Sequence, residues 1–178
     1  MDDLFESKIY NVFSFGSLSY GDAVIDLNAT ENIISDVQDF GIIKFKDTPI
    51  NRSKAITWVR VSDDKKIGFN GVIAIANCNL LTCVSWLQLK QQGFIDGKPM
   101  LIDGVPVIIR TPTISEWDKY VSSHPKPNWN HLGIYTICRD MKNSVCQVRG
   151  GEKLDSIHSF STDKKDSCMG FRPVIAKV

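Results

Sequence analysis

The five cysteines are the side chains of this sequence best suited to metal binding or redox chemistry. Cys78 and Cys83 stand closest together, with four residues between them, which makes a loose metal half-site. A structural zinc site needs a second cysteine or histidine pair at ligand spacing, and the sequence has none. Five is also an odd number, and the separations are too irregular for a disulfide framework. We therefore expect reduced thiols, no bound metal and no cofactor.

Other catalytic patterns are incomplete. The histidines are scattered along the chain at His124, His131 and His158. No serine lies in the Gly-x-Ser-x-Gly elbow that would activate it as a nucleophile. Asp163 and Asp166 resemble paired carboxylates, but Lys164 and Lys165 lie between them, a composition typical of a solvated turn. The sequence therefore predicts that the protein is not an enzyme.

The tryptophans would suit sugar or base stacking if they were exposed. Three of them lie on apolar faces of expected strands or helices and are predicted to be core residues: Trp58, Trp86 and Trp117. Trp129 differs because it lies in a Pro-Asn-Trp-Asn loop. It is either an anchor of that loop or an exposed contact, and it is retained as a candidate surface residue.

Two short signatures close the chain, Val148–Gly151 and Gly170–Val174. The paired glycines after a strand-like run predict a bend where a side chain would clash. We expect Phe171 to Val178 to form one terminal strand. Arg149 and Arg172 are predicted to be structural, satisfying backbone carbonyls and a carboxylate, either Asp140 or Glu116.

Local patterns predict many short strands and two short helices. Expected strands cover residues 9–15, 42–45, 56–61, 72–76, 98–102, 105–110, 134–138 and 145–148, besides the terminal strand. The capping-box patterns Ser85–Gln88 and Thr113–Glu116 predict a helix over 85–92 and a second helix that buries Ile114, Trp117 and Val121. Asp103-Gly104 predicts a hairpin, whose Pro106 places its strand on an edge or turns its nitrogen away from the ladder.

Length and charge narrow the choice of function. With 178 residues, 43% of them hydrophobic, the chain can bury a stable core without disulfides or a structural metal. Its 21 basic and 20 acidic residues nearly cancel, so the total indicates neither nucleic-acid affinity nor imitation of DNA. Acids stand at the N-terminus where a secretory signal needs bases, and no apolar run is long enough to span a bilayer. We therefore expect a cytoplasmic protein that does not use a membrane.

Several stretches in order carry a family resemblance: Ile56–Val59, Asn79–Leu81, Val84–Trp86, Gln92–Lys98, Ile102–Gly104, Glu116–Asp118, Cys138–Asp140, Val148–Gly151 and Gly170–Val174. Together they resemble small proteins encoded by phages and prophages of Gram-positive bacteria, related to the formylglycine-generating-enzyme (sulfatase-modifying factor) branch of the C-type-lectin-like fold. The resemblance covers residues 41–178 and implies an α+β, C-type-lectin-like domain with a loop-rich C-terminal half. Residues 1–40 are left as a segment of uncertain role: an oligomerisation arm, an extra edge strand or a partner-binding element.

The resemblance raises an oxidase hypothesis that the residues do not support. Formylglycine-generating enzymes need a pair of copper-binding thiols just after the Arg-Gly-Gly step. The matching segment here, Glu152–Phe160, contains no cysteine, so it lacks both the soft ligand and the redox centre. Calcium-dependent sugar binding is also disfavoured, because no cluster of carboxylates and amides is visible.

In this branch of the fold the segment after the Arg-Gly-Gly bend is presented on one surface. The candidate partner surface is therefore Lys153, Asp155, His158, Phe160, Asp163, Lys164, Lys165 and Asp166, with Trp129 added. Mixed charge around an aromatic side chain suits protein recognition, although a plain polar loop has the same composition.

The expected function is a non-enzymatic phage or prophage module that binds a protein partner, either a bacterial host protein or a virion component. As a free protein in the host cytoplasm it would inhibit a host defence system, in the manner of an anti-CRISPR. The alternative is a virion or tail-associated recognition protein. A third hypothesis is a nucleotide-sequestering protein or an enzyme with a hidden site, which requires a pocket converging on His131, Arg139 and Arg149. The sequence does not indicate an oligomeric state.

Overall fold

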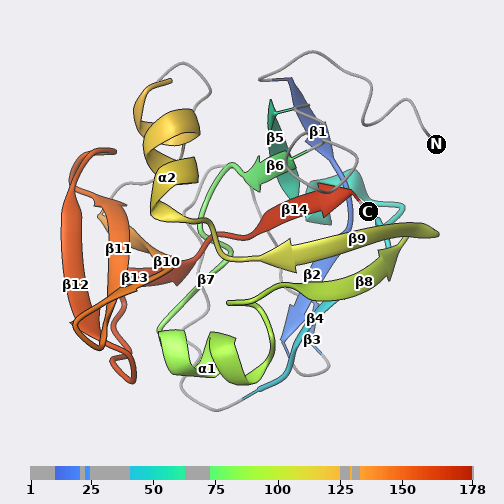
Figure 1. The fold of residues 1–178 in the computed structure, drawn as a ribbon. Coiled ribbons are helices and arrows are strands. Elements are labelled where there is room, and N and C mark those ends of the chain that lie inside the picture. The colour runs from blue at the N-terminus through green and yellow to red at the C-terminus, as the bar shows by residue number, and fades with distance from the viewer. Residues whose placement is uncertain are drawn as a thin grey trace.

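The computed structural model describes residues 11–20, 23–24, 41–62, 73–124, 129 and 133–177. In these ranges the protein is mostly β-sheet with a few short helical segments (Figure 1). This agrees with the α+β class expected from the sequence. Among the described helices, none has both the length and the apolar character needed to cross a membrane.

The described strands form three sheets. The first has six strands in the order β1 (Val12–Ser14), β5 (Thr57–Ser62), β6 (Ile73–Ala76), β14 (Val174–Lys177), β9 (Val105–Arg110) and β8 (Lys98–Ile102). The second has five, in the order β12 (Ile157–Ser161), β11 (Val145–Gly151), β10 (Ile134–Lys142), β13 (Met169–Phe171) and β7 (Leu81–Thr82). The third is β3 (Ala23–Val24), β2 (Ser17–Tyr20) and β4 (Ile43–Lys46). The described strand pairs are antiparallel except β10 with β13.

Both predicted capping boxes are confirmed. Helix α1 (Trp86–Gln91) is capped by Ser85, whose hydroxyl accepts from the Gln88 amide at 3.1 Å while the Gln88 side chain accepts from the Ser85 amide at 2.9 Å. Helix α2 (Ile114–Glu116) has the equivalent box with Thr113 and continues as the π-helix η4 (Trp117–Ser122). The 3-10 turn η2 (Arg52–Lys54) precedes β5. Of the three predicted core residues on the second helix, Trp117 and Val121 are buried, whereas Ile114 is only half-buried.

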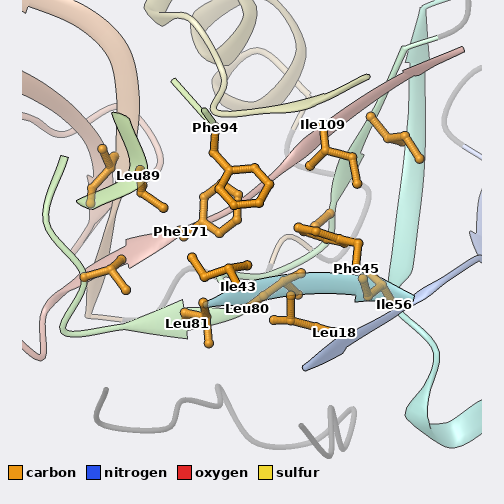
Figure 2. Packing of buried hydrophobic residues seen from close by; sticks show 14 of the residues in the cluster. Leu18, Ile43, Phe45, Ile56, Leu80, Leu81, Leu89, Phe94, Ile109 and Phe171 are labelled. Carbon is orange, nitrogen blue, oxygen red and sulfur yellow. The ribbon is translucent and has the colours of Figure 1, made fainter. Parts of the chain in front are cut away.

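The six-stranded sheet separates two hydrophobic clusters. On one face Val59, Ile75 and Val174 pack against Trp117 and Val121 of η4, which Figure 1 shows following α2 above the strands. The other face belongs to the larger cluster, where the Phe94 and Phe171 rings lie 5.4 Å apart and Phe45 stands edge-on to both (Figure 2). The predicted core tryptophans Trp58, Trp86 and Trp117 are all buried in these clusters.

Residues 11–20 belong to this packed unit. Phe15 and Leu18 are completely buried in the larger cluster, β1 forms the edge of the six-stranded sheet, and β2 pairs with β4. Apart from residues 23–24, which form β3, the remainder of the 1–40 segment lies outside the described residues.

The structure corrects two expectations about strands and decides between the two alternatives for Pro106. The terminal run is not one strand: β13 joins the second sheet and β14 the first, with Arg172 and Pro173 at the crossing. The strand containing Pro106, β9, is not an edge, because it lies between β14 and β8. Its nitrogen instead faces away from β8. Ile102 and Val105 flank the two-residue turn as a hydrogen-bonded pair, so the next pair, Leu101 and Pro106, is not hydrogen-bonded. The C-terminal part is also richer in strand than the expected loop-rich half, because β10, β11 and β12 form a continuous meander.

Candidate protein-recognition face

The Arg-Gly-Gly step is a bend that only glycine fits. Gly150 and Gly151 have φ angles of +86° and +87°, a region that side chains disfavour. A Cβ on Gly150 would lie 3.2 Å from the Trp117 ring, and a Cβ on Gly151 would lie 2.6 Å from Cζ of Tyr135. The prediction of a bend where a side chain would clash is therefore confirmed. Because Gly151 has no side chain, the Tyr135 ring can lie across the start of the loop that leads to β12.

After the bend the chain returns as strand β12, which the sequence analysis interpreted as part of a loop. The strand pairs with β11 without a bulge, from Arg149↔Ile157 to Val145↔Ser161. It is the outermost strand of its sheet and lies at the left margin of Figure 1. Ile157 is 60% exposed, a high value for a large apolar side chain. The presented segment is thus a sheet edge flanked by two charged loops.

An aromatic shelf lies on the inner face of this sheet. It is formed by Tyr135 of β10 and by His158 and Phe160 of β12. The Tyr135 ring centroid lies 4.8 Å from that of His158 and 6.0 Å from that of Phe160. The His158 and Phe160 rings are nearly parallel, with 16° between their planes. The Lys164 ammonium lies 4.4 Å from the centroid of Phe160, at the end of the shelf. His158 is exposed, whereas Tyr135 and Phe160 are half-buried against the main core.

The outer face is held by polar contacts. Gln147 Nε2 donates to the Ser159 hydroxyl at 2.8 Å. Arg149, the next outward residue of β11, is buried, and its Nε donates to Asp118 of η4 at 3.1 Å. These contacts anchor the hairpin to the body of the protein.

The loop after β12 is a locally bonded turn. The Lys164 ammonium lies 3.4 Å from Asp166, and Asp166 also accepts from the Cys168 amide at 3.0 Å. That backbone hydrogen bond lowers the pKa of the Asp166 carboxyl, and the bond from the Ser161 hydroxyl lowers the pKa of Asp163. The interpretation of Asp163 and Asp166 as turn residues rather than a catalytic pair agrees with this geometry.

Most of the sequence-predicted surface residues come together around β12. Two lie on the strand, His158 and Phe160, and the others flank it: Lys153, Asp155, Asp163, Lys164, Lys165 and Asp166. Sequence reasoning missed Tyr135, Ile157 and Ser159. Residues 157–161 read Ile-His-Ser-Phe-Ser between two turn signals, a pattern that could have indicated a short strand with Ile157 and Ser159. No local pattern indicated that Tyr135 of β10 would lie beside it.

The structure corrects the assignment of Trp129 to the candidate surface. It is only 5% exposed, its Nε1 donates to the His124 carbonyl at 3.0 Å, and it packs in the cluster beneath η4. Trp129 is therefore an anchor of its loop and not an exposed contact, and it is not part of the recognition face. The physical reason is the large apolar ring, which is buried with its centroid 5.9 Å from the Arg172 guanidinium.

The arginines are structural, but with partners other than those expected. Arg149 bonds Asp118 instead of Asp140 or Glu116. Arg172 is fully buried, with its guanidinium 5.2 Å from the Trp117 ring centroid. Glu116 instead pairs with Arg110, and Asp140 accepts from the Ile114 amide at 2.7 Å. The expected partners were wrong because sequence spacing does not show which strand lies beside a bend.

The residues that would form a hidden nucleotide pocket are not assembled in the described part of the chain. His131 lies outside it, Arg139 is exposed, and Arg149 is buried against Asp118. The five cysteines form no disulfide with one another, and Cys138 and Cys146 are buried. Across the described ranges, no three histidine, cysteine, aspartate or glutamate side chains lie close enough together to hold a metal ion.

Comparison of the chain with protein-family models, with curated proteins and with solved structures gives no match.

Proposed function

We propose that this chain is a non-enzymatic, phage- or prophage-encoded protein-binding module with a C-type-lectin-like fold. In this proposal it acts in the host cytoplasm by binding one component of a bacterial defence system, as anti-CRISPR inhibitors do. The phage origin, the fold family and the class of target all rest on the sequence resemblance of residues 41–178.

The observation that carries the binding proposal is the composition of the face around β12. An exposed large apolar residue, Ile157, lies on the outer face of β12, the exposed ring of His158 lies on its inner face, and basic and acidic side chains flank the strand. Protein interfaces commonly combine a small apolar or aromatic centre with a polar rim. The near-neutral total charge favours a partner recognised by such a local patch over one recognised by a charge field.

The test is affinity capture from a lysate of a bacterial host with a face variant and a matched control. The face variant carries Lys153→Ala, Ile157→Ala, His158→Ala and Lys165→Ala, four exposed side chains whose removal leaves the core intact. The control carries Lys46→Ala and Leu101→Ala, which are exposed on β4 and β8. Both variants should keep the wild-type thermal transition before they are compared.

The expected result is one host protein retained by the wild type and the control but lost by the face variant. A purified complex of that protein should then lose its defence activity when the wild type is added. If no host protein is retained and the chain instead co-sediments with phage particles, the inhibitor proposal is wrong and the chain is a virion component. Equal retention by the face variant would move the binding site elsewhere on the molecule.

A further inference from the structure

The backbone of β12 has one paired side and one open side. In an antiparallel pair, alternate residues direct both their N–H and C=O groups to the neighbouring strand. The Gly150 amide donates to the Ser156 carbonyl at 3.2 Å, which makes Gly150–Ser156 a hydrogen-bonded pair. From the β11–β12 register, His158 and Phe160 then bond β11, whereas Ile157, Ser159 and Ser161 direct their backbone groups outward.

Most of these outward groups have no backbone partner within the described residues. β12 pairs with β11 alone, and no other described backbone group bonds Ile157 or Ser159 across the edge. The carbonyl of Ser161 is the exception, because it accepts from the Lys164 amide at 3.1 Å. The edge therefore offers three N–H groups and two carbonyls in the spacing of an extended strand.

Two other edges of the described sheets are protected in ways that β12 is not. On β8, Pro99 occupies an outward position, since its neighbour Met100 belongs to the set that bonds β9, and proline has no N–H to offer. On β4, the Ile43 amide donates to Gln92 Oε1 at 2.8 Å, so a side chain covers that edge. β12 contains no proline, lysine or bulge. Such an unprotected edge is a template for strand addition.

The aromatic shelf determines which side chains an added strand would carry. Residues opposite His158 and Phe160 would lie on the inner face in non-hydrogen-bonded pairs, where opposing Cα atoms approach to about 4.5 Å. They would therefore contact the His158 ring and the exposed part of Phe160, with Tyr135 behind. Apolar or aromatic side chains at two positions, two residues apart, fit this surface best.

A second copy of this chain is a poorer occupant than a partner segment. A five-residue strand pair covers only a fraction of the roughly 1,200–2,000 Å² that stable interfaces bury. If two copies paired their β12 strands about a two-fold axis at Ser159, the Ile157 amide of one copy would face the Ser161 carbonyl of the other. That carbonyl already accepts from the Lys164 amide of its own chain, and the same conflict would arise at both ends of the pair. A partner segment has this conflict at one end only and can continue over the charged loops.

We propose that the free edge of β12 binds an extended segment of the partner protein as an added β-strand, with apolar side chains on the Tyr135–His158–Phe160 shelf. This inference rests on the proposed function, because it specifies how the same face recognises its target. It identifies the partner by chemistry: a chain segment with open backbone groups and apolar residues at alternate positions.

The probe is a display library of random twelve-residue peptides selected on the full chain. Enriched peptides are then measured by calorimetry against the wild type, Ser159→Pro and Ser159→Ala. Both variants lose the hydroxyl that accepts from Gln147, but only Ser159→Pro loses the outward N–H, as Pro99 does naturally on β8. We expect peptides with apolar residues two apart, wild-type-like affinity for Ser159→Ala, and about tenfold or greater loss for Ser159→Pro.

A second measurement on the wild type is independent of whether Ser159→Pro folds well. Hydrogen exchange resolved by residue should show that a selected peptide protects the amides of Ile157, Ser159 and Ser161. The amides of His158 and Phe160, already bonded to β11, should change little. This alternating pattern distinguishes strand addition from a side-chain contact.

Four results would overturn the inference. No enrichment, undiminished binding to Ser159→Pro, or uniform protection along β12 would each exclude strand pairing with a peptide. A concentration-dependent dimer in sedimentation analysis that Ser159→Pro abolishes would assign the edge to a second copy. The proposed function can hold without this inference: if the captured host protein is lost by the face variant but kept by Ser159→Pro, the face binds its partner without an added strand.

Discussion

The Asp103 carboxylate accepts two hydrogen bonds from Thr48, one from its backbone N–H at 2.8 Å and one from its hydroxyl. The Thr48 hydroxyl in turn accepts from the Gly16 amide at 2.7 Å. Asp103 stands in the tight turn between β8 and β9, whereas Gly16 joins β1 to β2. One carboxylate thus connects the β8–β9 hairpin to the N-terminal strands.

The first prediction concerns this contact. Asp103→Ala removes both acceptors and leaves an alanine at a φ of +51°, so we expect the free energy of unfolding to fall by about 2–4 kcal/mol. Asp103→Asn keeps one acceptor oxygen and a residue that tolerates positive φ, so its loss should be less than about half as large. Urea denaturation followed by circular dichroism measures both. Equal losses would show that the carboxylate contributes nothing beyond the turn conformation.

The second prediction tests whether residues 11–20 belong to the folded core. Leu18 is completely buried among core residues, so Leu18→Ala should destabilise the protein by about 2–5 kcal/mol. Val12→Ala, at an exposed position of β1, is the control and should cost less than about 1 kcal/mol. Deleting residues 1–40 should abolish the cooperative thermal transition. A deletion variant that still melts cooperatively would make the N-terminal strands dispensable.

Local chemistry explains what could be predicted from the sequence. The Ser85–Gln88 and Thr113–Glu116 boxes and the Asp103-Gly104 turn are set by residues within three positions of one another, so no tertiary information is needed. The tryptophans of strands and helices were placed correctly in the core because an apolar stripe has few other roles.

What the sequence did not reveal depends on pairing between distant segments. A run of strand-forming residues does not say which sheet it joins, so the crossing at Arg172–Pro173 was missed. The burial of Phe15 depends on the Ile56 carbonyl, which accepts from the Phe15 amide at 3.0 Å across 41 residues. At the recognition face, the flanking charges were found, but the open edge of β12 follows from its register with β11 and not from composition.

The third prediction concerns the bend that positions the aromatic shelf. Gly151→Ala would place a methyl group against the Tyr135 ring in addition to the cost of positive φ, so we expect a loss of about 2–4 kcal/mol. Gly104→Ala is the matched control, because Gly104 has a φ of +73° with no atom near the new methyl group. It should cost only about 1–2 kcal/mol. Similar losses in thermal denaturation would show that the close approach to Tyr135 is not needed.

The fourth prediction concerns thiol reactivity. Cys138 is completely buried, and this burial raises the pKa of its thiol despite the nearby Arg149. Iodoacetamide should therefore modify Cys138 only when the protein unfolds, whereas Cys168, half-buried beside the β12 loop, should react in the native state. Peptide mass mapping after timed labelling gives the two rates. Native labelling of Cys138 at the rate of Cys168 would contradict its placement in β10.

The last prediction is the acid response of the Arg110–Glu116 pair. Their side chains are mostly buried and approach at 2.5 and 2.7 Å, and Glu116 also accepts from the Thr113 amide at 2.9 Å. Burial opposes ionisation of Glu116, but the Arg110 and Thr113 contacts outweigh it, so the pKa of Glu116 is lowered from 4.5. A lowered pKa in the folded state means that the pair stabilises the protein above the unfolded pKa and loses this contribution as pH falls through the folded pKa.

Glu116→Gln should therefore be less stable than the wild type at neutral pH by about 2–4 kcal/mol, because Arg110 remains buried without its counterion. The difference should shrink as the pH is lowered from about 5 towards about 3, since the wild-type carboxylate is then protonated. Asp96→Asn is the control: the Asp96–Lys90 pair is exposed, so its removal should change the pH dependence much less. Urea denaturation at a series of pH values measures all three proteins, and a pH-independent gap between wild type and Glu116→Gln would show that the ionised pair does not stabilise the fold.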